Sequence, residues 1–147
     1  MLKINNILFV GASLLFGLFI TSCTGKAEVY GDLEQYWKEE KIVYNETDST
    51  VECHRLYWAF QLGLTELRDL GDNGFGTFVC LFDYDESGGT LRLYEFRTGH
   101  NTETVPADSL LQNYGVPTSD VTFEVVKLNH DDMVLRCDTT TLYFCAF

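Results

Sequence analysis

Alternation between apolar and polar side chains is the feature that most constrains how this chain folds. In "RLYWAFQLGL", Arg55 to Leu64, every second side chain from Leu56 onward is large and apolar, and the residues between them are smaller or more polar. Successive side chains of a β-strand point to opposite faces. This period of two therefore predicts a strand with one face buried in a core and the other face turned outward.

Several further segments are typical of strands, because they alternate or form short apolar runs between turn residues. They are residues 36–44, 75–85, 90–96, 121–128, 133–137 and 142–147.

The connections contain turn-forming residues, and one segment has a helical pattern. "GDNG" at 71–74 and "DESGG" at 85–89 supply glycines and side-chain acceptors for tight turns. Further turns are expected at 129–132 and 138–141. A helix is predicted over 107–115, with Asp108 as its N-cap and Gly115 as its C-terminal stop.

These elements place the chain in the all-β class. Seven or eight short strands with sequential, short connections favour a single antiparallel up-and-down β-barrel of about eight strands with one short helix. Closure into a barrel removes the exposed edge strands that an open sheet would leave. A β-sandwich is the alternative architecture.

The first residues have the pattern of a secretory signal. Lys3 precedes 14 apolar or small residues, Ile7 to Ile20, which is short of the roughly 20 residues that span a membrane. The sequence Ile20-Thr21-Ser22-Cys23 resembles the lipobox of bacterial lipoproteins, which implies lipidation of Cys23. We therefore expect a cleaved signal peptide at 1–22, a lipid-anchored tether at 23–28 and one folded domain at 29–147.

The expected location is the bacterial cell envelope, attached to the membrane through Cys23. Thr24, in place of aspartate, favours the outer membrane, and the sequence leaves open whether the domain faces the periplasm or the cell surface. Removal of residues 1–22 takes away Lys3 and no acid, so the formal net charge changes from −12 to −13. Such a charge disfavours nucleic acid as a partner.

The carboxyl-terminal residues resemble a known family. "FEVVKLNHDDMVLRCDTTTLYFCAF" is similar to the end of the lipocalin-like lipoproteins of Bacteroidetes. The lipobox, the chain length and Trp37 at the first strand agree with this resemblance. It implies a lipocalin-like β-barrel. The positions that match the family's pattern are Phe123, Lys127, Leu128, Met133, Leu135, Leu142, Tyr143 and Phe144.

Aromatic residues carry the functional hypothesis. If the barrel encloses a cavity, Trp58, Phe60, Phe78 and Phe82 are its expected lining, and the protein is a non-catalytic binding module for a small hydrophobic or amphipathic ligand. If these side chains fill the core, the alternative is an interaction or inhibitor-like lipoprotein that binds a protein partner through its loops and acidic surface.

The remaining candidate sites give weaker signals. Cys53, Cys80, Cys137 and Cys145 are possible disulfide partners, because an exported protein meets oxidising conditions. "DYDESGG" from Asp83 begins like a calcium loop, but the twelfth position is Tyr94 instead of an acid. The scattered histidines lack metal-ligand spacing, and no nucleophile or phosphate-loop motif is present. We expect no enzyme activity, cofactor or metal.

Overall fold

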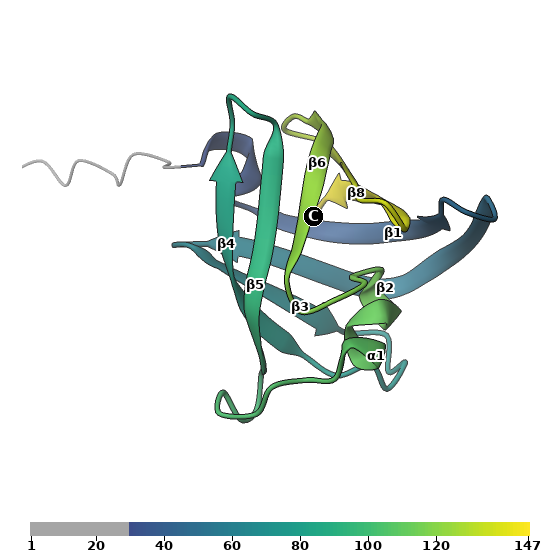
Figure 1. Ribbon diagram of the computed structural model, residues 1–147, viewed down its shortest axis with the longest axis vertical. Coiled ribbons are helices and arrows are strands. Elements are labelled where there is room, and N and C mark those ends of the chain that lie inside the picture. Colours follow the sequence, from purple (N-terminus) through teal and green to yellow (C-terminus); the bar gives the residue numbers. More distant parts are fainter. Residues whose placement is uncertain (1–29) are drawn as a thin grey trace, which may run out of the picture.

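The computed structural model describes residues 30–147, and these residues form a closed antiparallel barrel in which each strand pairs with the next and β8 pairs with β1 (Figure 1). The up-and-down barrel predicted from the sequence is confirmed, in preference to the sandwich. The elements in chain order are η1 Gly31–Leu33, β1 Tyr36–Tyr44, β2 Ser49–Gln61, β3 Leu64–Asp69, β4 Phe78–Asp85, β5 Thr90–Thr98, α1 Asp108–Leu111, η2 Gln112–Tyr114, β6 Val121–Leu128, β7 Asp132–Arg136 and β8 Thr140–Ala146.

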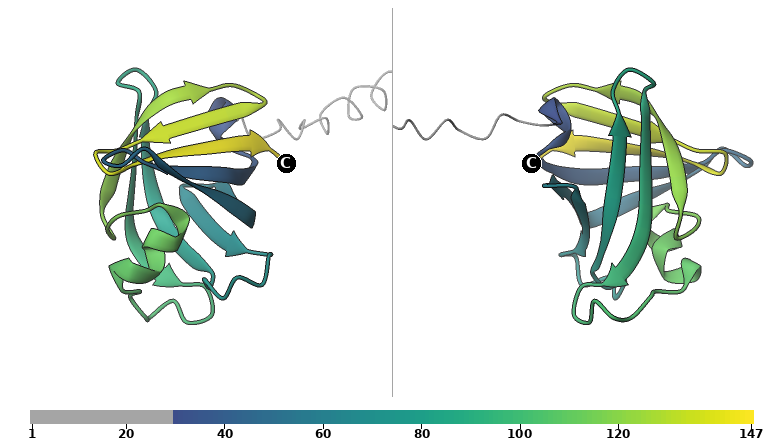
Figure 2. Two further views of the ribbon diagram at one scale, coloured as in Figure 1. Left: turned by 90° about the vertical axis from the view of Figure 1, so that its right-hand side faces the viewer. Right: turned by 60° about the vertical axis from the view of Figure 1, so that its left-hand side comes forward.

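The up-and-down order divides the connections between two ends of the barrel (Figure 2). The amino-terminal end carries Tyr30 and η1, the β2–β3, β4–β5 and β6–β7 turns, and the last residue, Phe147. The capped end carries the β1–β2, β3–β4 and β7–β8 connections together with α1 and η2. The predicted signal peptide, Cys23 and the predicted tether lie outside the described residues.

One predicted strand is two strands in the structure. The segment Arg55–Leu64 was expected to be a single strand, but β2 ends at Gln61 and β3 begins at Leu64. Leu62 and Gly63 form the tight turn between them, with φ of 54° and 79°. Leu62 and Leu64 therefore leave the buried face and are 64% and 51% exposed. The glycine supplies the left-handed conformation that such a turn needs.

Three β-bulges keep charged side chains out of the core. Strict alternation after Trp37 and Glu39 would point Lys41 inward, but the register shifts between Glu39 and Lys41, so Ile42 is the next buried residue. A shift in the β4–β5 pairing buries Phe96 instead of Glu95 in the same way. In β6, a shift between Val125 and Lys127 leaves Lys127 exposed and packs Leu128 against the core. Bulges also increase the local bend that a closed sheet requires.

A short segment closes one end of the barrel. This cap, defined as Leu111–Val116, completely buries Leu111, Tyr114 and Val116. The Tyr114 hydroxyl donates to the carbonyl of Gly76, and the Thr140 hydroxyl donates to the carbonyl of Gly115 at 2.7 Å. The cap is therefore tied both to the β3–β4 connection and to β8.

The helix prediction was correct at its end and wrong at its start. The helical segment stops at Gly115, whose φ is 71°. The N-cap, however, is Ala107, and Asp108 is the first helical residue. The Asp108 carboxylate instead accepts a hydrogen bond from the backbone N–H of Ser119 at 3.0 Å. A contact distant in sequence has thus replaced the local cap.

Substitution of Gly115 tests how tightly the cap is packed. A Cβ atom at this position would collide with Leu142 and lie 3.2 Å from Ile42. We expect Gly115→Ala to lower the free energy of unfolding by about 2–4 kcal/mol, from the left-handed backbone and overpacking together. The control is Gly63→Ala, which also has a positive φ but meets nothing within 4 Å. Urea unfolding of both variants provides the comparison, and equal losses would contradict tight packing of the cap.

Candidate functional site

The four aromatic residues expected to line a cavity lie inside the barrel and are buried. The Phe60 ring meets Phe82 edge-on at 5.4 Å and lies 6.3 Å from Trp58. Phe78 lies nearer the cap, with its ring centre 6.0 Å from that of Tyr114. The structure therefore brings three of the four into one aromatic cluster and places the fourth against the cap. Their role as ligand contacts stays a prediction.

A single acid lies within this apolar interior. Glu39 is completely buried, and the Trp58 indole N–H donates to its Oε2 at 3.0 Å. Its Oε1 has no hydrogen-bond partner among residues 30–147. Burial raises the pKa of the Glu39 carboxyl well above its ordinary value, although the Trp58 hydrogen bond opposes this shift. The core therefore holds this side chain in its neutral form over a wider pH range than water would.

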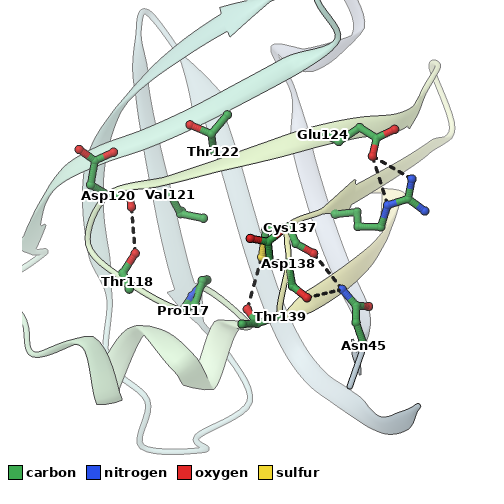
Figure 3. Close-up of a pocket in the computed structure, with 11 residues that line it drawn as sticks. Asn45, Pro117, Thr118, Asp120, Val121, Thr122, Glu124, Cys137, Asp138 and Thr139 are labelled. Carbon is green, nitrogen blue, oxygen red and sulfur yellow. Dashed lines mark hydrogen bonds and ion pairs between the residues drawn. The ribbon is translucent and has the colours of Figure 1, made fainter. Parts of the chain in front are cut away.

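A groove arises where two neighbouring strands separate (Figure 3). β6 and β7 are paired at Glu124 and Arg136, and the same register would continue with Phe123 opposite Cys137 and then Thr122 opposite Asp138. Pairing stops before that point, and a groove of about 760 Å³ lies between the two segments. This polar groove is lined by Asn45, Pro117, Thr118, Asp120, Val121, Thr122, Glu124, Arg136, Cys137, Asp138 and Thr139.

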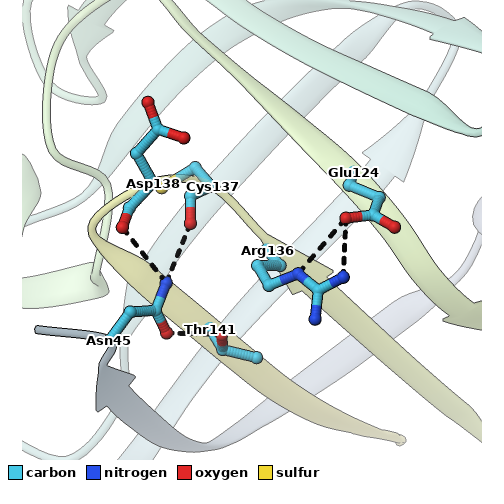
Figure 4. Close-up of polar contacts among 6 residues, drawn as sticks. All are labelled: Asn45, Glu124, Arg136, Cys137, Asp138 and Thr141. Carbon is cyan, nitrogen blue, oxygen red and sulfur yellow. Dashed lines mark hydrogen bonds and ion pairs between the residues drawn. The ribbon is translucent and has the colours of Figure 1, made fainter. Parts of the chain in front are cut away.

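Asn45 holds the β7–β8 turn away from β6 (Figure 4). Its side-chain amide donates to the carbonyls of Cys137 at 2.8 Å and Asp138 at 3.4 Å, and it accepts from the Thr141 hydroxyl at 2.7 Å. Its backbone N–H donates to the carbonyl of Thr139 at 2.9 Å. Asn45 therefore satisfies three backbone carbonyls of the β7–β8 turn. The turn stays next to the end of β1 and does not pair with β6, so the groove stays open.

The polar groove carries more negative than positive charge. Arg136 is paired with Glu124 at 2.8 Å, and Arg92 is paired with Asp120 at 2.7 Å. The Arg92 hydrogen bond and charge lower the pKa of Asp120, so this acid stays ionised. Asp138 has no ion pair among residues 30–147. With hydroxyls from three threonines alongside, the lining suits a neutral hydroxylated group or a cation better than an anion.

Two smaller hollows continue this surface around the cap. The middle hollow, about 230 Å³, shares Pro117 and Thr139 with the polar groove. The far hollow, about 170 Å³, shares Tyr44 and Gln112 with the middle one. Apolar side chains of the far hollow include Ile42, Val51, Leu56 and Phe75. The far hollow also has polar lining from Glu52, His54 and Asn73. The three hollows together form a rim around the capped end, and its middle section is the most apolar of the three.

The four cysteines of the described residues are free thiols in this structure. The disulfide expected for an exported protein stays a prediction. Cys80 is buried, and burial raises its pKa to about 12. Cys137 is half-buried in the polar groove. Burial alone would raise its pKa, but hydrogen bonds from the Thr139 hydroxyl and from the backbone N–H groups of Thr139 and Thr140 outweigh this effect and lower it. Cys137 is therefore the thiol whose surroundings favour the reactive thiolate.

Residues 30–147 contain no group of three or more His, Cys, Asp or Glu side chains arranged to hold a metal ion. In the calcium-like segment, Asp85 instead accepts hydrogen bonds from Ser87 and Gly88, at 2.9 Å each, within the β4–β5 turn. None of the helices formed by these residues has the length and apolar character to cross a membrane.

Comparison with known families decides the relationship. The family model of the lipocalin-like domain matches residues 18–147. The chain belongs to the lipocalin-like domain family. Folds of this family are typically binding folds without catalytic activity, and the resemblance drawn from the carboxyl-terminal motif is confirmed.

Two solved structures share the fold. A lipocalin-like protein from Bacteroides uniformis has a TM-score of 0.63 at 22% identity and covers 80% of this chain and 100% of its own. An uncharacterized protein from Bacteroides eggerthii has a TM-score of 0.59 at 17% identity and covers 77% of this chain and 98% of its own. At these identities the likeness concerns the fold. No curated protein matches the chain.

The rim was not predicted from the sequence. Its members are polar residues of turns and connections, such as Asn45, Thr118 and Asp138, which are common in any loop. The groove forms because β6 and β7 stop pairing, and the sequence gives no local sign of this. The loss of pairing depends on hydrogen bonds from Asn45 to Cys137 and Asp138, which are more than 90 positions away.

The Glu39 carboxyl predicts a particular pH dependence of stability. Because the pKa of Glu39 is raised in the folded state, the native protein keeps a proton that the unfolded chain loses above about pH 4.5. The free energy of unfolding therefore decreases progressively as pH rises. We expect Glu39→Gln, which retains an acceptor for Trp58, to gain stability over the wild type as pH increases from 4.5 to 8.5. Each unit of pKa elevation corresponds to about 1.4 kcal/mol.

Urea unfolding at several pH values measures this difference. The control is Glu124→Gln, which removes an exposed, ion-paired acid and should give no comparable gain. A stability difference between Glu39→Gln and wild type that does not change with pH would contradict a raised pKa in the folded state.

Alkylation with iodoacetamide tests the environment of Cys137. Its reaction should begin at a lower pH than that of Cys145, whose pKa is raised by burial and by Glu40. Thr139→Val should move the Cys137 profile to higher pH, because a hydrogen bond to the thiolate is lost. Peptide mass spectrometry of each site measures both profiles. Identical profiles for the two cysteines would show that the threonines do not tune Cys137.

Proposed function

We propose that the protein is a cell-envelope lipoprotein, anchored through Cys23, that binds an amphipathic small molecule along the rim of its capped barrel. The observation that carries this proposal is that three hollows lie next to one another around the cap. The aromatic residues predicted to line a cavity are instead packed against one another in the core. The family's typical use of its fold for binding supports the same class of function.

The rim suits a ligand with two chemically different parts. A neutral hydroxylated or cationic group fits the polar groove beside Asp138, because this carboxylate has no cation in an ion pair with it among the described residues. A hydrocarbon or ring part fits the middle hollow against Tyr44 and Pro117. Burial of that part against carbon surface contributes affinity at about 25 cal/mol per Å² before the costs of binding are subtracted.

A protein partner is the competing function. The acidic surface, with a formal net charge of −12 for the full chain, favours cationic partners. The experiment below separates these functions, because a protein partner leaves no small molecule on the purified protein.

The test uses the mature protein purified from its own host membrane in mild detergent. Native mass spectrometry is expected to show a mass that is lost on denaturation. Thr139→Trp fills the junction of the polar groove and the middle hollow, so it should reduce retention of that mass at least about tenfold. The matched control is His130→Trp, in the β6–β7 turn at the other end, which should retain the mass.

A third variant separates rim binding from binding inside the barrel. Trp58→Phe changes the interior aromatic cluster but touches none of the three hollows of the rim. It should retain the ligand once the folded fraction is taken into account. Loss of the ligand in Trp58→Phe with retention in Thr139→Trp would place the ligand in the interior. A single bare mass in every sample would contradict the small-molecule function.

A further inference from the structure

Large exposed apolar side chains gather on the outer wall of β1, β2 and β3 near the amino-terminal end. Tyr36 is 56% exposed, Leu62 64%, Leu64 51% and Phe147 80%. We call this surface the apolar wall and define it as Tyr36, Tyr57, Ala59, Leu62, Leu64 and Phe147. An exposed apolar patch of this kind on a soluble domain marks an interaction surface more often than isolated apolar residues do.

The wall is a built surface. The Phe147 backbone N–H donates to the carbonyl of Tyr36 at 3.0 Å, and the Phe147 ring packs edge-on against Tyr57 at 4.9 Å. Tyr36 is opposite Ala59 in the β1–β2 register. A shallow hollow of about 130 Å³ lies between these side chains, with the ion pair of Glu66 and Arg68 at its edge. The last residue of the chain is thereby fixed in the wall.

The position of the tether brings this wall close to the membrane. The described chain starts at Tyr30, whose ring packs against Phe82 at 4.9 Å at the amino-terminal end. Cys23 lies seven residues earlier. Even a fully extended chain covers at most about 3.6 Å per residue, so an anchor at Cys23 holds this end within about 25 Å of the bilayer.

The distribution of charge selects one side of that end. The β4–β5 turn carries Asp85 and Glu86, and the β6–β7 turn carries Asp131, all exposed. Lys38 and Arg68 both lie opposite Tyr57 in the strand registers, next to the apolar wall, and the charge of Arg68 is paired with Glu66 at 2.6 Å. Anionic lipid headgroups repel the acidic turns and attract Lys38, while tyrosines and phenylalanine are suited to the boundary between headgroups and acyl chains.

We infer that the apolar wall is a membrane-docking face, so that the anchored barrel lies with the outer side of β1–β3 on the bilayer. This inference rests on the lipid anchor at Cys23 that the proposed function includes. In this orientation, the acidic turns point away from the lipid. The capped end with α1 lies at the opposite end of the barrel from η1 (Figure 1), so the rim stays open to ligand.

The experiment uses the lipidated mature protein in vesicles of phosphatidylethanolamine and phosphatidylglycerol. A small fraction of the phosphatidylethanolamine carries a photoactivatable diazirine in its acyl chain. After irradiation and digestion, mass spectrometry locates the lipid adducts. Adducts on peptides that contain Tyr36, Leu62 or Phe147 should exceed those on the peptide with Val105 and Leu110 at least about fivefold. Val105 and Leu110 are matched controls, since they are 60% and 43% exposed but lie in the connection at the capped end.

A double variant, Leu62→Ser with Phe147→Ser, should lower the adduct yield at Tyr36 severalfold, whereas Val105→Ser with Leu110→Ser should leave it unchanged. Both changes are at exposed positions, so the fold is retained. Adducts spread equally over both ends would overturn the docking face.

The mass of the amino-terminal peptide reports the anchor separately. An anchored protein with scattered adducts rejects the face and leaves the proposed function standing. A protein without the lipid mass rejects the anchor, and the docking face then stands only if the adducts still concentrate on the apolar wall.

Discussion

Filling of the barrel interior is the constraint on which the rest of the structure depends. An eight-stranded barrel is just wide enough for side chains to fill it. Here Trp58, Phe60, Phe82 and Phe144 interlock edge-on or tilted, and the cap adds Tyr114 from one end. Close-packed interiors leave little room for a guest molecule, and the polar groove lies on the outside. The same filling isolates the Glu39 carboxyl from water, which leaves the indole of Trp58 as its hydrogen-bond partner.

Irregularities of the sheet produce the features that distinguish this barrel from a regular one. The bulges turn Lys41, Glu95 and Lys127 outward, so a chain with charges at core-facing positions of its alternation still closes around an apolar interior. The separation of β6 from β7 has a similar local cause. Asn45 satisfies the backbone carbonyls of the β7–β8 turn, so the turn does not extend the β6–β7 ladder. An unpaired polar backbone group would otherwise favour continued pairing.

The two ends of the barrel present different surfaces. At the amino-terminal end, the chain enters next to the apolar wall, and the final residue is fixed there by the backbone of β1. At the capped end, the long connection between β5 and β6 supplies both the cap, Leu111–Val116, and one side of the rim. The proposed lipid anchor near the first of these ends and the proposed ligand surface around the second would place binding away from the bilayer.

The sequence by itself determined the all-β class, the up-and-down barrel, the end of the helical segment at Gly115 and the relationship to the lipocalin-like family, because these depend on local alternation, turn residues and short spacings. Tertiary structure alone decided that Leu62 and Leu64 lie outside and that Asp108 binds Ser119 instead of capping its helix. It also decided that polar residues of separate connections meet in one groove. Those outcomes depend on strand register and on hydrogen bonds between distant residues, and a one-residue shift in register reverses which side chains face the core.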